Sequence, residues 1–397
     1  MSGLRVVVIG AGVGGISLAR GLLRDGHQVT VFEQRPDVKA AGGAVTIWSN
    51  GATVLAQLGV DMDHAGQPLT AVRVLTSTGR SLVTIDVNSV VHGLGAPVRM
   101  VPRRILLERL LDGFPLDRIR CDSRAVGVAT TPSGVRVQFD DGTVVEGDVA
   151  IGADGLHSVV RDAVGAQCAR PTGWCSWQGL VTVPDGADVG IADKTVAQIY
   201  IGERGSLGLW PAGGAELQWW FDLPWSSDFV RPGRPIDVLR ASFTGWCPSA
   251  DRILALLTDD DLARSPFPHF RHPVPRCASA GSMTLLGDAA HTMPPTLAQG
   301  TNQALLDTMV LCRSLSGLAT GCNGRLSDAL RWYENTRRRK VMAVSWLASL
   351  QVSRSESVLR PAAMFPDRLT TWALTTFLRS TSHARMSTAV SRDLRAV

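Results

Sequence analysis

The sequence predicts an α/β protein: a parallel sheet flanked by helices, interrupted by a second, mostly β region and followed by C-terminal helices. Three observations predict it. A complete strand–helix–strand unit opens the chain, and two later apolar strands each lead into an acidic residue and a helix. Between these strands, residues 172–246 are strand-like and hold seven of the eleven tryptophans. Because 397 residues exceed the size at which one core keeps growing, more than one domain is expected.

The first unit follows the pattern of a dinucleotide-binding motif. Val6–Ile9 is a short β-branched run, as in a buried parallel strand. Gly10, Gly12 and Gly15 then form G-x-G-x-x-G at the start of a stretch with helical apolar spacing. A second strand ends on Glu33, 23 positions after the first glycine, near the spacing that a ribose requires.

Each residue of this motif has a physical role. Gly10 allows a tight turn, Gly12 lacks the Cβ that would hold a pyrophosphate away from the backbone, and Gly15 lets the helix pack closely on the sheet. The helix N-terminus offers free N–H groups to phosphates. Glu33 can accept both hydrogen bonds of a ribose diol, which favours FAD or NAD over NADP.

Composition limits the remaining classes of protein. Apolar residues make up 45% and charged residues 19%, as in an ordinary soluble chain. No apolar run reaches the ~18 residues of a spanning helix, and no signal peptide precedes the first strand. The seven cysteines are scattered singly, without a C-x-x-C pair. We therefore expect a cytoplasmic protein with no metal site, no disulfide framework and no stable membrane insertion.

The net charge of +5 comes almost wholly from arginine, and its densest run is 337–340, Arg-Arg-Arg-Lys. Such a run can bind nucleic acid or acidic lipid, but no nucleic-acid-binding module accompanies it. We therefore expect a solvated helix face and no nucleic-acid partner.

The remaining chain divides into alternating segments. Helical spacing is expected over residues 50–58, 103–111 and most of the chain from 301, strands within 70–100, and a β-meander over 119–150. The predicted domains are a discontinuous nucleotide-binding domain (1–70, 100–170 and 276–345), a substrate-binding β-sheet domain (71–99 and 171–275) and a C-terminal helical segment (346–397).

Two further motifs place carboxylates at strand ends. Residues 154–161 read DGLHSVVR and residues 287–291 read GDAAH, each after a short apolar strand and before a helix. Parallel strands direct such side chains into the crevice where α/β sheets bind ligands. Asp288 is suited to a polyol hydroxyl, and the helix that begins near Thr301 would direct its N–H groups at negative charge.

Together these sites resemble the single-component (class A) flavoprotein monooxygenases, the family of aromatic and polyketide hydroxylases. Its pattern is an N-terminal GxGxxG with a ribose Glu, then DGxxSxVR, then GDAAHxxxPxxGxGxN, in the same order as here. The resemblance implies a GR2-type Rossmann-like FAD-binding domain, an inserted mixed β-sheet over the substrate, and C-terminal helices.

The resemblance also implies residue roles around a non-covalent FAD. Asp154 lies near the pyrophosphate and is implicated in NAD(P)H use. Ala298 departs from the pattern, because the family has the first glycine of GxGxN there, and a methyl group would narrow the approach to the flavin ring. The implied FAD-contacting residues are Gly10, Gly12, Val13, Gly14, Gly15, Glu33, Gln34, Arg35, Ala44, Arg103, Val126, Asp154, Asp288, Pro295, Leu297, Gly300, Thr301 and Asn302.

The reaction that this implies is reduction of FAD by NADH or NADPH, capture of O2 as a flavin C4a-hydroperoxide, and transfer of one oxygen to the substrate. No second G-x-G-x-x-G in a strand–helix context exists, so the nicotinamide cofactor would bind transiently. The flavin carries the chemistry, so a catalytic side chain is not required. Candidates for a base are Tyr200, which fits a sheet residue better, and His291, which fits a structural role.

The substrate region is rich in aromatic residues. Strand alternation places Gln218 and Trp220 on one face and Trp219 and Phe221 on the other. A predicted pocket of Trp210, Gln218, Trp220 and Pro294 suits a flat, largely apolar aromatic or polycyclic substrate, such as an indole-like metabolite. The urate hydroxylase branch has an Arg and a Tyr where this chain has Ser206 and Gln218, which implies a substrate other than urate.

Several alternatives stay open. A flavin-dependent halogenase shares the FAD domain, but its W-x-W-x-I-P signature and relay lysine are missing. An epoxidase or a non-catalytic FAD-binding protein fits the same motifs. Residues 365–378 are amphipathic enough for a membrane surface, yet we expect them to cover the nucleotide domain. The choice between NADH and NADPH and the oligomeric state are not predicted.

Overall fold

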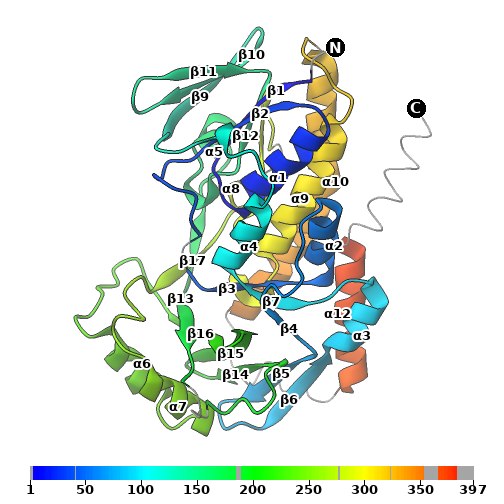
Figure 1. The fold of residues 1–397 in the computed structure, drawn as a ribbon. Coiled ribbons are helices and arrows are strands. Elements are labelled where there is room, and N and C mark those ends of the chain that lie inside the picture. The colour runs from blue at the N-terminus through cyan, green and yellow to red at the C-terminus, as the bar shows by residue number, and fades with distance from the viewer. Residues whose placement is uncertain are drawn as a thin grey trace.

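The computed structural model describes residues 3–40, 42–184, 189–275, 278–321, 323–352 and 365–381 (Figure 1). The elements of the first half are β1 (Arg5–Ile9), α1 (Val13–Arg24), β2 (Gln28–Phe32), β3 (Ala44–Ile47), α2 (Ser49–Gln57), β4 (Gln67–Pro68), β5 (Ala71–Thr76), β6 (Ser81–Asp86), α3 (Val87–Leu94), β7 (Arg99–Pro102), α4 (Arg103–Leu111), β8 (Ile119–Arg120), β9 (Ala125–Thr131), β10 (Gly134–Phe139), β11 (Val144–Gly147), β12 (Val149–Gly152) and α5 (Val159–Ala163). Those of the second half are β13 (Arg170–Thr182), β14 (Val196–Gly202), β15 (Gly205–Gly213), β16 (Glu216–Pro224), α6 (Pro235–Phe243), α7 (Pro248–Leu256), β17 (Phe267–Arg271), β18 (Met283–Leu285), α8 (Asp288–His291), α9 (Gly300–Leu315), α10 (Asn323–Val352) and α12 (Asp367–Thr381).

A five-stranded parallel sheet has the strand order β18-β12-β1-β2-β8. The first strand–helix–strand unit is β1, α1 and β2, as the sequence predicts, and Val8 pairs with both Val31 and Ile151. The chain leaves β1 for β2 on one side and returns to β12 on the other. This reversal opens a crevice at the carboxyl ends of the strands, which is where open α/β sheets bind ligands.

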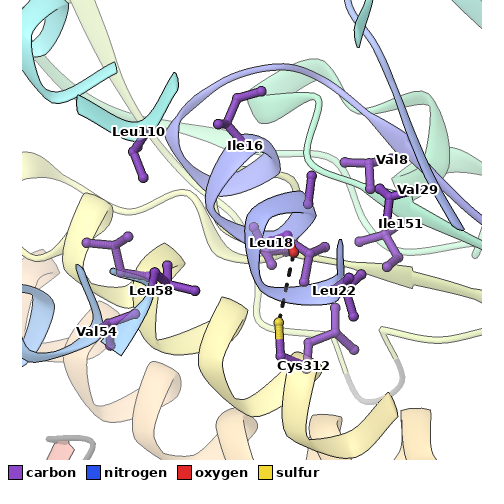
Figure 2. Packing of buried hydrophobic residues seen from close by; sticks show 14 of the residues in the cluster. Val8, Ile16, Leu18, Leu22, Val29, Val54, Leu58, Leu110, Ile151 and Cys312 are labelled. Atoms are coloured by element: carbon purple, nitrogen blue, oxygen red, sulfur yellow. Dashed lines mark hydrogen bonds between the residues drawn. The ribbon is translucent and has the colours of Figure 1, made fainter. Parts of the chain in front are cut away.

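The core of this half lies between the parallel sheet and the helices α1 and α9 (Figure 2). Leu18 and Leu22 of α1 pack with Val29 and Ile151 of the sheet, and all four are completely buried. A Cβ built on Gly21 would lie 2.5 Å from Cys312 Sγ, so this glycine allows α1 to approach α9 closely. This packing fixes the N-terminus of α1 beside the crevice.

A seven-stranded mixed sheet forms the other half, in the order β17-β13-β16-β15-β14-β5-β6. Its neighbours are antiparallel except for β14 and β5. The helices α6 and α7 lie along one face (Figure 1), where Trp219 and Phe221 pack with Phe243 and Ile253. The opposite face of the sheet is therefore the one available for a ligand.

Two three-stranded sheets complete the fold. The predicted β-meander is confirmed for β9, β10 and β11, whereas β8 and β12 at the two ends of the predicted range belong to the parallel sheet. The meander packs on the parallel sheet through Phe139 and Phe32, whose ring centroids lie 4.6 Å apart. The second has the order β3-β7-β4 and contains the short strands that enter and leave the seven-stranded sheet. The predicted α/β class is thus confirmed.

Two stretches that the sequence predicts to be strand-like contain helices. Asp86 caps α3 by accepting a hydrogen bond from the Ser89 amide at 3.2 Å, and Gly95 ends this helix with φ 77°. Proline occupies the first turn of α6, where its missing N–H costs nothing. In α3 the capping residues outweigh the β-propensity of the valines between them.

Two expectations for the C-terminal region are wrong. Residues 365–378 do not chiefly cover the nucleotide domain: α12 packs on β6 and α3 at the edge of the mixed sheet, with Leu378 in a core that includes Val72 and Trp210. The arginine run is not a solvated face throughout, because Arg337 is only 3% exposed and is paired internally. The predicted segment 346–397 also includes residues 353–364 and 382–397, which lie outside the described residues.

Candidate functional site

A single continuous cavity of about 1550 Å³ lies between the carboxyl ends of the parallel sheet and the open face of the mixed sheet. Typical small-molecule sites occupy about 300–1,000 Å³. The cavity therefore has room for a dinucleotide together with a second molecule.

The glycine loop forms one wall of this cavity. Gly10 has φ 105°, and a Cβ there would lie 2.4 Å from the Ala153 carbonyl oxygen. A Cβ on Gly15 would lie 1.9 Å from the Gly10 carbonyl oxygen, so close packing of loop and helix requires glycine. Gly12 differs, because a Cβ there would have no protein atom within 4 Å and would project into free space. The surface beside Gly12 is thus open to a ligand.

Glu33 lies on the cavity wall just past the end of β2. Its Oε2 accepts a hydrogen bond from the Ala11 amide at 2.9 Å, and its Oε1 accepts one from the Arg35 amide at 3.1 Å. The carboxylate is therefore fixed beside the glycine loop, where each oxygen keeps a further acceptor site for a ribose hydroxyl.

Asp154 lines the same cavity, and one of its carboxylate oxygens has no hydrogen-bond partner. Its Oδ2 accepts a hydrogen bond from the Val159 amide at 2.8 Å, whereas its buried Oδ1 has no protein partner. Burial raises the pKa of this carboxyl group. A buried polar atom without a partner is unusual, and a bound ligand hydroxyl or a water molecule would satisfy it.

Arg161 joins the second motif to the third. Its Nη1 donates hydrogen bonds to the carbonyl oxygens of Ala289 and Ala290, at 2.9 and 2.8 Å, and the side chain is 1% exposed. Ser158 caps α5 by accepting a hydrogen bond from the Arg161 amide at 3.0 Å. The Ser and Arg of DGxxSxVR therefore position the loop that carries Asp288.

Asp288 and Arg103 supply opposite charges to the cavity wall. Arg103 is exposed to the cavity; desolvation by the protein around it lowers the pKa of its guanidinium, and the Asp288 carboxylate acts in the opposite direction. A Cβ on Gly300, at the start of α9, would lie 4.0 Å from Asp288 Oδ1. The α9 N-terminus and Asp288 thus border one space, suited to hydroxyl groups and developing negative charge.

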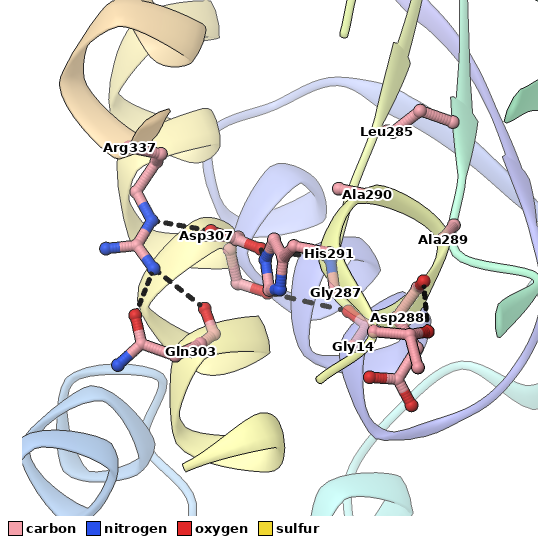
Figure 3. A network of polar contacts seen from close by, with 12 residues as sticks. Gly14, Leu285, Gly287, Asp288, Ala289, Ala290, His291, Gln303, Asp307 and Arg337 are labelled. Carbon is pink, nitrogen blue, oxygen red and sulfur yellow. Dashed lines mark hydrogen bonds and ion pairs between the residues drawn. The ribbon is translucent and has the colours of Figure 1, made fainter. Parts of the chain in front are cut away.

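A buried ionic network supports the loop that carries Asp288, on the side away from the cavity (Figure 3). Asp307 accepts hydrogen bonds from the Gly287 amide at 2.9 Å, from His291 Nε2 at 2.5 Å and from Arg337 Nε at 2.5 Å. The Asp288 carboxylate points away from these groups in Figure 3. The network therefore positions the loop, while Asp288 remains available to a ligand.

Ala298 adopts the left-handed conformation, with φ 49° and ψ 36°. This conformation costs an L-residue about 1–2 kcal/mol, and glycine adopts it readily. The departure from the GxGxN pattern therefore carries backbone strain at the cavity wall. The Asn302 side chain donates to the Ala298 carbonyl oxygen at 2.9 Å and holds the turn in place.

The structure brings most of the predicted site residues together. The cavity-lining members of the predicted FAD site are Gly10, Gly12, Val13, Gly14, Glu33, Gln34, Arg35, Ala44, Arg103, Val126, Asp154, Asp288, Pro295, Leu297, Gly300 and Thr301. Trp210, Gln218 and Trp220 line the same cavity from the mixed sheet. Gln218 Oε1 accepts a hydrogen bond from the Ala44 amide at 2.5 Å, which joins the two halves at the cavity.

Three other predicted cavity residues do not lie on the cavity wall. Gly15 is covered by the Gly10 backbone. Asn302 is completely buried. Its side-chain Oδ1 accepts from the Trp48 amide and its Nδ2 donates to the Thr46 carbonyl oxygen, each at 2.9 Å. Pro294 is buried between Met293 and Pro295, both of which line the cavity. These residues shape the wall from behind.

Neither candidate base faces the cavity. Tyr200 lies on the helix-covered face of the mixed sheet, with its hydroxyl 2.7 Å from Gln198 Oε1 and 3.0 Å from Ser249 Oγ. Burial raises its pKa, which also disfavours a role as a base. His291 is buried against Asp307, behind the loop. Both positions fit the structural roles that the sequence favoured for these residues, and neither fits a base.

Sequence reasoning missed a polar group on the sheet wall, composed of Ser176, Asp222 and His269. The signal for Asp222 was present, because the two-residue alternation that places Gln218 and Trp220 toward the cavity continues to position 222. The serine and the histidine belong to strands β13 and β17, whose register with β16 no sequence pattern predicts.

The described residues show no metal centre, since no group of three or more His, Cys, Asp and Glu side chains is placed to hold an ion. None of the described helices combines the length and the apolar character needed to cross a membrane. The cavity itself fits FAD: Gly12 leaves open the space that a pyrophosphate requires, and Asp154 presents an unsatisfied acceptor beside it.

Comparison with known proteins identifies similar chains. The FAD binding domain family matches residues 3–347. An FAD-dependent urate hydroxylase from Klebsiella pneumoniae is 30% identical over 85% of this chain and 87% of its own length. A 3-amino-4-hydroxybenzoate 2-monooxygenase from Streptomyces cremeus is 31% identical over 84% of this chain and 83% of its own. The crystal structure of Klebsiella pneumoniae HpxO complexed with FAD and uric acid has a TM-score of 0.80 and 26% identity, covering 97% of this chain and 95% of that one.

These similarities span both the parallel sheet with its glycine loop and the mixed sheet over the cavity. They confirm the predicted fold class and FAD as the cofactor that the family binds. The chain belongs to the FAD-binding-domain family, among relatives that are single-component FAD-dependent hydroxylases and monooxygenases.

Proposed function

We propose that this chain is a cytoplasmic NAD(P)H-dependent monooxygenase that transfers one oxygen atom from O2 to a flat aromatic or polycyclic substrate. The observation that supports it is the single cavity, which joins the glycine loop, Glu33, Asp154 and Asp288 to an aromatic sheet wall. A cofactor and a substrate in this space would lie in contact, which direct oxygen transfer requires.

The chain's own residues would bind and orient the two molecules. The amides at the start of α1 would hold the pyrophosphate, Glu33 the ribose and Asp288 the ribityl hydroxyls. The amides at the start of α9 would stabilise negative charge on the pyrimidine side of the flavin. Bound FAD supplies the redox chemistry, namely acceptance of hydride from NADH or NADPH and activation of O2.

In this proposal each predicted domain has its own role. Residues 1–70, 100–170 and 276–345 hold FAD, and residues 71–99 and 171–275 form the wall above the substrate. Trp210 and Trp220, whose ring centroids lie 5.7 Å apart, offer aromatic planes. Gln218 supports this wall, because its Oε1 accepts from the Ala44 amide and its Nε2 donates to the Trp219 carbonyl oxygen. The aromatic wall also excludes water from the reacting atoms.

The test is oxidation of NADH and NADPH by the FAD-loaded protein in ¹⁸O₂, with mass spectrometry of products from a panel of aromatic metabolites that includes urate. We expect at least one flat aromatic compound to accelerate NAD(P)H oxidation tenfold or more and to gain one ¹⁸O atom. Urate is expected to have no such effect, because Ser206 and Gln218 stand where the urate branch has an Arg and a Tyr.

Two outcomes would contradict the proposal. NAD(P)H oxidation without label in any product would favour an oxidase or a non-catalytic flavoprotein. Halogenated product, formed only when halide is added, would favour the halogenase alternative. Because each outcome has its own product, a single series of incubations distinguishes them.

A further inference from the structure

A cluster of four polar side chains lies at one end of the sheet wall. Ser176 Oγ donates a short hydrogen bond to Asp222 Oδ1, and Ser206 Oγ donates to Asp222 Oδ2 at 3.0 Å. His269 Nε2 lies 2.7 Å from Ser176 Oγ. All four residues line the cavity, from the neighbouring strands β13, β15, β16 and β17.

Asp222 is the acidic residue of this wall. Burial raises its pKa, whereas His269 and the hydrogen bonds from Ser176 and Ser206 act in the opposite direction. Among the described cavity-lining residues of the seven-stranded sheet, Asp222 and His269 are the two ionisable groups, and His269 Nε2 lies 3.9 Å from Asp222 Oδ1. Burial lowers the pKa of His269, which favours the neutral imidazole, although the Asp222 charge opposes the shift. The carboxylate thus lacks a permanent cationic partner on this wall, and a buried charge without one is costly.

The carboxylate still has capacity to bind a ligand. Each of its oxygens accepts one serine hydroxyl, which leaves a further acceptor site on each oxygen. The Asp222 side chain is 15% exposed, and it faces the cavity on the same side of β16 as Gln218 and Trp220. A donor group from a bound molecule can therefore reach it.

The residues beside Asp222 on the sheet wall indicate what kind of molecule would carry this donor group. Trp220 lies two residues before Asp222 on the same face, about 7 Å along the strand. Across β15 the wall is apolar, with Ile199 in the cross-strand row of Trp220 and Ile201 in the row of Asp222. A flat ring against Trp220 would thus lie against an apolar surface with the carboxylate near one edge.

We infer that Asp222 is the residue that selects the substrate: it binds an ammonium or ring N–H donor carried by the aromatic substrate, while Ser176, Ser206 and His269 fix its orientation. This inference rests on the proposed function, since it concerns the substrate of that site. It narrows the substrate class to aromatic amines and N–H heteroaromatics and disfavours aromatic carboxylates.

The test compares three indole probes of matched shape and different charge: tryptamine, tryptophol and indole-3-propionate. Their affinities for the FAD-loaded protein are measured by isothermal titration calorimetry without NAD(P)H, so that no turnover is required. We expect tryptamine to bind at least tenfold more tightly than indole-3-propionate, with tryptophol between them. In Asp222→Asn, which keeps the shape and removes the charge, the ratio should fall below threefold.

A second variant serves as the control. Asp228→Asn removes an exposed carboxylate from the same domain and should leave the tenfold preference unchanged. The FAD affinity and melting temperature of Asp222→Asn should match those of the unmodified protein, which shows that the variant is folded.

Three results would overturn the inference: no preference for tryptamine in the unmodified protein, a full preference in Asp222→Asn, or no saturable binding of any probe. None of them bears on oxygen transfer, which the labelled-dioxygen experiment tests separately. Conversely, a protein that binds tryptamine through Asp222 but transfers no oxygen would refute the proposed function and leave this recognition site intact.

Discussion

Replacing Asp307 by alanine is expected to lower the free energy of unfolding by about 3–5 kcal/mol, because it leaves buried charge without its partner. Asp307 is completely buried and accepts from Gly287, His291 and Arg337 at once. Arg337 would keep only its contacts with Gln303 (Figure 3). The loop that carries Asp288 would lose its support as well, so FAD affinity should fall together with stability.

The measurement is urea unfolding of the FAD-loaded and FAD-free proteins. The matched control is Asp328→Ala, an exposed carboxylate on α10 that pairs with Arg331 on the helix surface and should contribute no more than about 1 kcal/mol. A loss below 1 kcal/mol for Asp307→Ala would show that the network contributes little to stability.

The same network predicts a pH dependence. Burial alone would raise the pKa of Asp307, but His291 and Arg337 outweigh it and lower the pKa to about 2. A carboxyl group whose pKa is lowered on folding stabilises the protein above its unfolded pKa, near 4. The contribution of about 2 kcal/mol should therefore be present at neutral pH and be lost as the pH falls from about 4 to 2.

The second large effect is expected from adding a methyl group at Gly12 or at Gly15, with different results at the two positions. Gly12→Ala should fold normally, because the added Cβ has no protein atom within 4 Å, yet bind FAD at least tenfold more weakly, since that Cβ occupies the pyrophosphate space. Gly15→Ala should fail to form a stable protein, because its Cβ would lie 1.9 Å from the Gly10 carbonyl oxygen.

Thermal melting and FAD titration of both variants check this pair. Each variant is the control for the other, since both add a single methyl group within the same glycine motif. If Gly12→Ala binds FAD as tightly as the unmodified protein, the pyrophosphate lies elsewhere. If Gly15→Ala melts normally, the loop and helix are less closely packed than the structure shows.

Local patterns in the sequence predicted the FAD-binding half well. The glycine loop, Glu33, Asp154 and Asp288 each follow a strand directly, so short-range signals suffice to place them at one sheet edge. The short β12 and β18 were recognisable because buried parallel strands are continuous apolar runs. The GD-motif turn was also recognisable, including the departure at Ala298, but the left-handed conformation that accounts for the usual glycine became visible only in the structure.

Long-range packing was less predictable. Arg337 belongs to a basic run, and nothing within this run distinguishes the member that contacts Asp307, 30 residues earlier. The Ser176–Asp222–His269 group depends on the register of three strands, which becomes visible only once the sheet is formed. Helix α3 was missed because its capping residues outweigh the β-propensity of its valines, and α6 was missed within a strand-rich region although Ile236, Leu239 and Phe243 have helical spacing.

A crystal structure of the FAD complex would test the central claim most directly. The claim predicts the pyrophosphate beside Gly12, the ribityl chain at Asp288, and the isoalloxazine ring beneath Gln218 and Trp220, facing the mixed sheet. An FAD molecule bound outside this cavity, or one whose ring points away from that sheet, would contradict it.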